Sequence, residues 1–164
     1  MTFIESETIE LKSSVVADLC KEVIAFANTR GGTLYIGVED NGTVIGVDSA
    51  DRVTLQINNM VRDSIKPDIT MFVHYETQVI NDKQIIAVTV QEGTDRPYYL
   101  GSKGLKPSGV YVRNGTSTDP ASDTAIRKMI KETDGDSFET MRSLEQNLSF
   151  QAAEAQFAQE EGSL

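Results

Sequence analysis

The apolar positions of the chain change their spacing abruptly near residue 30. Residues 15–29 repeat apolar side chains every three or four positions, which predicts a helix, and the repeat stops before the Gly31-Gly32 pair. The apolar residues that follow alternate with period two, which predicts a buried strand over residues 34–38. Asp40-Asn41-Gly42 then supplies a tight turn, so we expect a hairpin with a second strand over residues 43–47.

Strand and helix signals continue along the rest of the chain. Asp48 or Ser49 caps a second helix that Pro67 must end, and Asn81-Asp82 turns one alternating run into the next as a second hairpin. The expected strands cover residues 8–12, 71–79, 85–90 and 110–113, and a third helix carries apolar residues between 125 and 130. The fold class is therefore α+β, with a mixed, mainly antiparallel sheet of hairpins packed against two or three helices.

Two stretches lack a regular apolar pattern. Residues 93–107 are rich in Gly, Pro, Ser and Lys, which indicates an irregular and mobile loop. Asp134-Gly135-Asp136-Ser137 marks a boundary. We expect one domain over residues 1–133 and an acidic, partly helical extension over residues 134–164 that leads to a further domain in a longer parent protein.

Composition excludes several classes of protein. No apolar run approaches the roughly 20 residues that cross a bilayer, and the first five residues lack the features of a signal peptide, so we expect a cytoplasmic protein without membrane contact. The chain holds one cysteine, Cys20, and one histidine, His74, which rules out a disulfide framework and a multi-histidine zinc site and argues against a conventional triad. A P-loop sequence is also missing.

The formal charge of -10 argues against unspecific attraction to a polyanion. Residues 134–164 hold seven acids and one arginine, so most of the negative charge lies in the extension. Residues 96–118, by contrast, contain two lysines and two arginines and no acid. This window is either an ordinary solvated loop or a local phosphate-binding surface.

Two groups of residues are candidates for chemistry. Glu10 and Lys12 alternate along a strand onto one face, with Glu5 five residues earlier, which is either a solvated charged face or a set of ligands and a helper for Mg²⁺ or Mn²⁺. Phosphate contacts require cations and free backbone amides. The candidates for nucleic-acid binding are Arg30, Gly31, Gly32, Lys103, Lys106, Arg113 and Ser117.

Three motifs in order, at residues 5–12, 26–47 and 109–117, give the chain a family resemblance. Over residues 3–132 it resembles the Schlafen AlbA-type DNA-binding domain family. The resemblance implies nucleic-acid binding within a bacterial-type transcriptional regulator or a helicase-related protein. Animal Schlafens also cleave RNA with a metal ion, and the resemblance implies Glu5, Glu10 and an acid of the 39–40 turn, for which we favour Asp40, as the corresponding ligands.

The first interpretation is a module that binds DNA or RNA, is not an enzyme by itself and has no certain cofactor. The alternative is a Mg- or Mn-dependent endoribonuclease in which Glu5, Glu10 and Asp40 hold the metal and Lys12 assists. A further alternative is a protein-interaction or dimerisation module. A single copy of the domain would form a homodimer to build a groove, through an apolar edge strand at residues 71–79 or 85–90.

Overall fold

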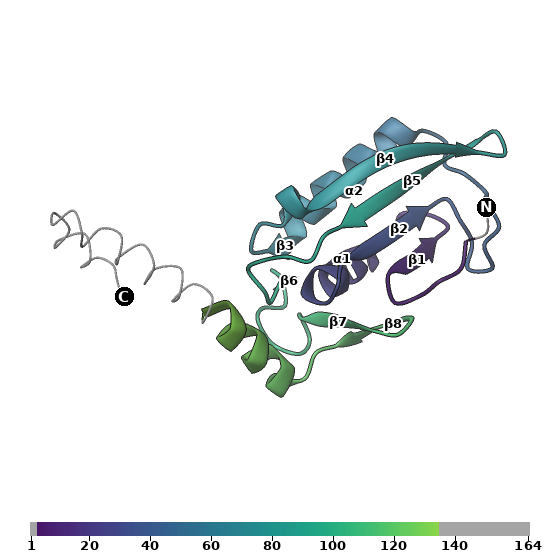
Figure 1. Ribbon diagram of the computed structural model, residues 1–164. Helices are drawn as coiled ribbons and strands as arrows, with labels where there is room; N and C mark the ends of the chain where they lie inside the picture. Colours follow the sequence, from purple (N-terminus) through teal and green to yellow (C-terminus); the bar gives the residue numbers. More distant parts are fainter. Residues whose placement is uncertain (1–2, 135–164) are drawn as a thin grey trace, which may run out of the picture.

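The computed structural model describes residues 3–134. They form one four-stranded sheet, two short two-stranded sheets, three α-helices and a short 3-10 helix (Figure 1). The elements are β1 (Ile9–Lys12), α1 (Leu19–Asn28), β2 (Gly32–Ile36), α2 (Ala50–Ser64), β3 (Ile65–Lys66), the 3-10 helix η1 (Thr70–Phe72), β4 (Val73–Ile80), β5 (Lys83–Val90), β6 (Tyr99–Leu100), β7 (Tyr111–Asn114) and β8 (Ser117–Pro120). A third helix begins at residue 123 and reaches residue 134, and the extension expected beyond it lies outside the described residues.

The main sheet has the strand order β1-β2-β5-β4. β1 runs parallel to β2, and the other two pairings are antiparallel. The expected fold class, α+β with a mixed and mainly antiparallel sheet, is therefore confirmed. β5 lies inside the sheet with a partner on each side, so residues 85–90 do not form the free edge that the sequence suggested.

The core lies between the sheet and the two helices α1 and α2, which pack on the same face (Figure 1). α1 is buried along almost its whole length, because the sheet covers one side and the β7–β8 hairpin covers another. Gly31 ends α1: its N–H donates to the carbonyl of Phe26 at 2.7 Å, and its φ of +78° turns the chain into β2. A Cβ at Gly31 would lie 2.7 Å from the Val90 oxygen.

Some local expectations differ from the structure. Residues 43–47 do not form a strand, and one isolated bridge joins Val38 to Val44. β2 ends at Ile36 because Gly37, with a φ of +103°, leaves the extended conformation, and its carbonyl accepts the N–H groups of both Ile45 and Gly46. Within residues 3–134, no helix has the length and apolar character that a membrane crossing requires.

The segment expected to be an irregular loop contains β6, which pairs with β3. A second short strand, β8, which the sequence did not predict, pairs with β7. The third helix packs against both segments through a small apolar cluster made of Val110, Ala121, Ile126 and Met129 with Tyr99 and Val112 at its margin. These contacts attach the third helix to β6 and β7.

Candidate functional site

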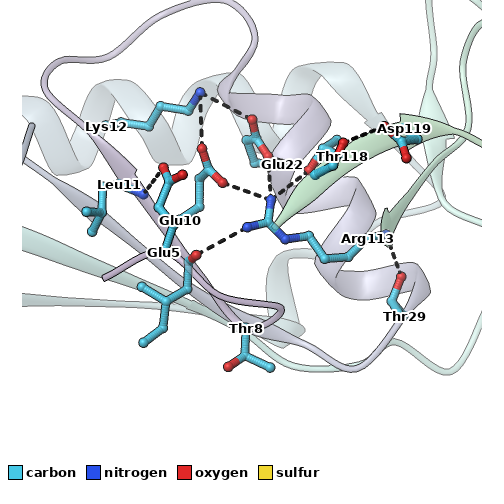
Figure 2. A network of polar contacts seen from close by, with 12 residues as sticks. Glu5, Thr8, Glu10, Leu11, Lys12, Glu22, Thr29, Arg113, Thr118 and Asp119 are labelled. Atoms are coloured by element: carbon cyan, nitrogen blue, oxygen red, sulfur yellow. Dashed lines mark hydrogen bonds and ion pairs between the residues drawn. The ribbon is translucent and has the colours of Figure 1, made fainter. Parts of the chain in front are cut away.

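A group of charged side chains is buried where β1, α1 and the β7–β8 hairpin meet (Figure 2). We call Glu10, Lys12, Glu22, Arg113 and Thr118 the buried ion-pair cluster. Its first two members stand on the face of β1 that turns toward α1, as the period-two pattern predicts. The cluster joins three elements that are far apart in the sequence.

Arg113 is the centre of this cluster, and its side chain is 1% exposed. One guanidinium nitrogen, Nη1, lies 2.8 Å from Glu10 Oε1 and 3.4 Å from Glu22 Oε1. The other, Nη2, donates to the main-chain carbonyls of Ser6 at 2.8 Å and Ile9 at 3.2 Å. Burial of a guanidinium is tolerated because nearly all its donors are used in this way.

The remaining members complete the charge balance. Lys12 Nζ lies 3.2 Å from Glu22 and 3.7 Å from Glu10, and the Thr118 hydroxyl donates to Glu22 at 2.5 Å. Burial opposes the charged form of Lys12, but the carboxylates of Glu22 and Glu10 outweigh it and raise the pKa of Lys12. Two cations therefore offset two carboxylates.

The burial of Arg113 corrects its expected role in phosphate binding. A side chain that is enclosed and bound to carboxylates cannot reach a nucleic-acid backbone without leaving the cluster. Arg96 is also engaged, at 2.8 Å from Glu92. Of the four cations in residues 96–118, two are thus occupied by acids of the same domain.

Glu10 is the member of the cluster whose ionisation is most disturbed. Burial, together with the charge of Glu22, raises the pKa of Glu10 to about 7, although the hydrogen bond from Arg113 works in the opposite direction. Between pH 4.5, the usual pKa of the group, and about 7, the folded state keeps a proton that the unfolded state has released. The resulting stability is complete at low pH and is lost as the pH rises through about 7.

As the pH rises from about 5 to about 8, Glu10 loses its proton in the folded wild-type protein, whereas the glutamine of Glu10→Gln has no proton to lose. We therefore expect the free energy of unfolding of the wild type to fall by up to about 3 kcal/mol relative to that of Glu10→Gln over this range. Urea unfolding followed by circular dichroism at each pH measures the difference. Glu7→Gln, at a partly exposed carboxylate just before β1, is the matched control. Glu7→Gln keeps Glu10 and should therefore follow the wild type. A stability difference between the wild type and Glu10→Gln that does not change with pH, or that changes no more than the difference between the wild type and Glu7→Gln, would contradict this interpretation of the cluster.

Of the three expected metal ligands, Glu5 and Glu10 lie close enough for their charges to interact, but Asp40 does not join them. Within residues 3–134, no three His, Cys, Asp or Glu side chains come close enough together to hold a metal ion. Glu5 accepts the N–H of Leu11 at 3.3 Å, Glu10 is held by Arg113, and Asp40 lies in the exposed turn after β2 beside Ser13 and Asn41. The Glu5, Glu10 and Asp40 set, with Lys12 as helper, does not fit a metal centre of the kind that the resemblance implies.

The two glycines have structural roles. The Gly31 N–H is used at the end of α1, and Gly32 pairs with Val90 in the sheet. A Cβ at Gly32 would lie 2.5 Å from the Phe26 ring, so the packing of α1 on β2 requires glycine there. This pair therefore does not provide the free amide donors that we expected for phosphate.

Lys103 and Lys106 are exposed on a compact loop between β6 and β7, which we call the basic loop (residues 101–109). The carbonyl of Gly109 accepts the Leu100 N–H at 2.9 Å and closes the base of the loop. The N–H of Lys103 donates to Leu100 at 3.0 Å, and the carbonyl of Lys106 accepts the N–H of Gly109 at 2.8 Å. The backbone at both lysines is therefore fixed by hydrogen bonds.

The β3–β6 pairing brings a third lysine to the basic loop. Lys66 stands opposite Tyr99 in the ladder, and the Gly101 N–H donates to the Ser64 carbonyl at 2.8 Å. A Cβ at Gly101 would lie 3.2 Å from Lys66 Cγ, so the lysine side chain runs against the start of the loop. Among residues 3–134, no acid forms an ion pair with Lys66, Lys103 or Lys106.

Two other candidates lie elsewhere on the surface. Arg30 follows α1, with its side chain 71% exposed and 3.4 Å from Glu7. Ser117 is exposed at the start of β8 and donates to Asp119 at 2.6 Å. Each has an acidic side chain beside it, and the negative charge of that acid weakens the attraction of the site for an anion.

Sequence reasoning missed Glu22, Thr118 and Lys66. Glu22 had a signal, because it falls three residues after Leu19 and four before Phe26, on the apolar side of the helix. A charged residue in that place must be paired when it is buried. Lys66 had no signal, since its neighbourhood with the basic loop arises from two strands of two residues each.

A family profile described as "Schlafen, AlbA_2" matches residues 5–122. The fold is similar to the N-terminal domain of a Nitrosomonas europaea protein named as related to the ATP-dependent DNA helicase RecG, with 30% identity, a TM-score of 0.54, and coverage of 69% of this chain and 82% of that chain.

A second solved structure, the DIP2311 protein of Corynebacterium diphtheriae, is 20% identical with a TM-score of 0.52, and the likeness covers 70% of this chain and 25% of that chain. At that identity the likeness concerns the fold alone. No curated protein matches the sequence.

Proposed function

Because the chain belongs to the Schlafen AlbA_2 family, we propose that it binds the phosphate backbone of DNA or RNA through the basic loop and Lys66, as a module of a transcriptional regulator or helicase-related protein. The proposal is based on which cations of this segment form ion pairs with acids and which do not. Lys103 and Lys106 are exposed without an acid partner among residues 3–134, whereas Arg96 and Arg113 are already paired.

A fixed loop suits this role. Holding two lysine backbones in place by hydrogen bonds reduces the ordering that binding would otherwise require. Lysine side chains remain long enough to follow phosphates that differ in position, and such contacts carry little information about base sequence. Binding through the basic loop should therefore depend strongly on salt and weakly on sequence.

The negative net charge does not prevent such binding. Attraction to phosphate depends on the local field, which falls off over about 10 Å at ordinary salt. Arg30 and Ser117 extend the proposal as weaker contacts, because the acid beside each must be displaced or left unneutralised. The helicase-related neighbour supports the same context, as its name refers to a DNA helicase.

We do not extend the proposal to cleavage. The residues that the family resemblance suggested for a metal centre are separated or already neutralised within residues 3–134. A function as a binding module requires none of them to change partner. The test below therefore includes a measurement of strand cleavage, which this proposal does not expect.

The test is fluorescence anisotropy with labelled single-stranded DNA, duplex DNA and hairpin RNA, over salt from about 50 to about 200 mM. We expect at least one probe to bind and its affinity to fall with salt. With Mn²⁺ added, we expect intact strands on a denaturing gel. Absence of binding to all three probes at the lowest salt would overturn the proposal. Cleavage that Asp40→Asn abolishes would show instead that the exposed 39–41 turn is catalytic.

A further inference from the structure

The two edge strands of the main sheet, β1 and β4, differ in whether their outward backbone groups form hydrogen bonds. On the β1 edge, Ile9 exchanges hydrogen bonds with Ser6, and its carbonyl also accepts from Arg113 at 3.2 Å. The Leu11 N–H donates to the Glu5 carboxylate at 3.3 Å. The outward N–H and C=O of Ile9 and the N–H of Leu11 are therefore used within the domain, so the β1 edge is largely closed.

The β4 edge is open. The Phe72 carbonyl, just before β4, accepts a hydrogen bond from the Gln91 N–H. The Gln84 carbonyl of β5 points away from β4 and accepts a hydrogen bond from the Val47 N–H. In an antiparallel pair of strands, hydrogen-bonded residue pairs alternate with pairs that are not hydrogen-bonded. The bond at Phe72 therefore implies that the even-numbered residues of β4 bond to β5, and that Tyr75, Thr77 and Val79 direct their N–H and C=O groups outward. Within residues 3–134, these outward groups accept or donate no hydrogen bond.

Apolar side chains accompany this open edge. Val79 is 65% exposed, and Leu55 of α2, which lines a groove against β4, is 60% exposed. Tyr75 also lines that groove, and its buried hydroxyl has no hydrogen-bond partner among the described residues. β4 is eight residues long and carries no proline, lysine or bulge of the kind that protects natural edge strands.

We propose that β4 pairs antiparallel with β4 of a second copy of this chain, about a two-fold axis at Thr77. Thr77 then faces Thr77, and Tyr75 faces Val79, as pairs whose outward N–H and C=O groups bond each other directly. The two sheets become one continuous sheet with twice the number of strands. This inference does not depend on the proposed binding of nucleic acid.

The register of the two β4 strands follows from the side of the sheet to which each residue points and from the charge of Glu76. Facing residues must point to the same side of the sheet, so the axis passes through a residue rather than between two. An axis at Glu76 would place two carboxylates directly opposite each other, which is destabilising. An axis at Thr77 places Glu76 opposite Gln78 and His74 opposite Ile80, and it keeps almost the whole of β4 paired.

The oligomeric state tests the proposal. Light scattering after gel filtration should give the wild-type chain twice the mass of one 18.0 kDa chain. Thr77→Lys places two ammonium groups at the axis and should weaken the dimer at least about tenfold. Thr89→Lys makes the same change at an exposed position of the interior strand β5 and should remain dimeric. A monomeric wild-type chain, or equal behaviour of the two variants, would overturn the proposal.

Disulfide trapping tests the register. Thr77→Cys places two thiols in facing positions, where Cα atoms lie about 5.5 Å apart and can be bridged. In Gln78→Cys the equivalent thiols are two positions out of line and more than about 7 Å apart. The natural Cys20 is buried and does not interfere. We expect a cross-linked dimer for Thr77→Cys alone. Cross-linking of both variants, of neither, or of Gln78→Cys alone would overturn the assigned register.

Discussion

Arg113→Met is expected to lower the free energy of unfolding by about 3–5 kcal/mol. The guanidinium is enclosed and lies against two carboxylates, so its removal leaves Glu10 and Glu22 buried with Lys12 as their shared cation. Removing one partner of a buried ion pair costs much more than the pair contributes in net terms, because the remaining charge has lost its compensation. Urea unfolding monitored by circular dichroism measures the change.

Arg30→Met is the matched control, because it removes an arginine from an exposed pair with Glu7. Exposed pairs contribute about 0–1 kcal/mol, so this variant should stay close to the wild type. The double variant Arg113→Met with Glu10→Gln removes one of the uncompensated charges and should regain part of the loss. Equal unfolding midpoints for Arg113→Met and Arg30→Met would show that the cluster does not hold the hairpin to the sheet.

The second large effect concerns binding. Lys103→Ala with Lys106→Ala should weaken nucleic-acid binding at least about tenfold at a fixed low salt concentration, with little change in stability. Both side chains are exposed, and the hydrogen bonds that shape the basic loop come from its backbone. Anisotropy titration with the probe that the wild-type chain binds best measures the loss.

A control for net charge is available in the same domain. Lys83 begins β5 and Arg52 lies in the first turn of α2, at the end of the sheet away from β6 (Figure 1). Lys83→Ala with Arg52→Ala removes the same two charges and should change the affinity much less. If both double variants lose affinity equally, the attraction comes from overall charge and the basic loop has no special part in it.

The sequence predicted the elements whose signal is local. The end of α1 and the start of β2 follow from the apolar spacing and from Gly31, whose positive φ and close contact with Val90 leave no room for a side chain. The β4–β5 hairpin follows from two alternating runs joined at Asn81-Asp82, both of which adopt positive φ. In each case the residues that determine the structure are neighbours along the chain.

The role of Arg113 could not be predicted in the same way. Its partners come from β1 and from α1, about ninety to one hundred residues earlier. A window of four cations without acids looks like a phosphate-binding surface until the fold brings Glu10 and Glu22 to Arg113. Arg96 is paired locally, by Glu92 four residues before it and just outside the window. The strands β3 and β6 were missed because two residues give no periodic signal.

The contact between the basic loop and phosphate is tested most directly by the slope of log K against log salt for the wild-type chain and for Lys103→Ala with Lys106→Ala. Each phosphate contact of a lysine contributes about 0.9 to the slope on duplex DNA and about 0.7 on single strands. If both lysines contact phosphate, the variant's slope is smaller by about 1.4–1.8. An unchanged slope, with affinity equal to that of the wild-type chain, would contradict the assignment of the basic loop as the nucleic-acid contact.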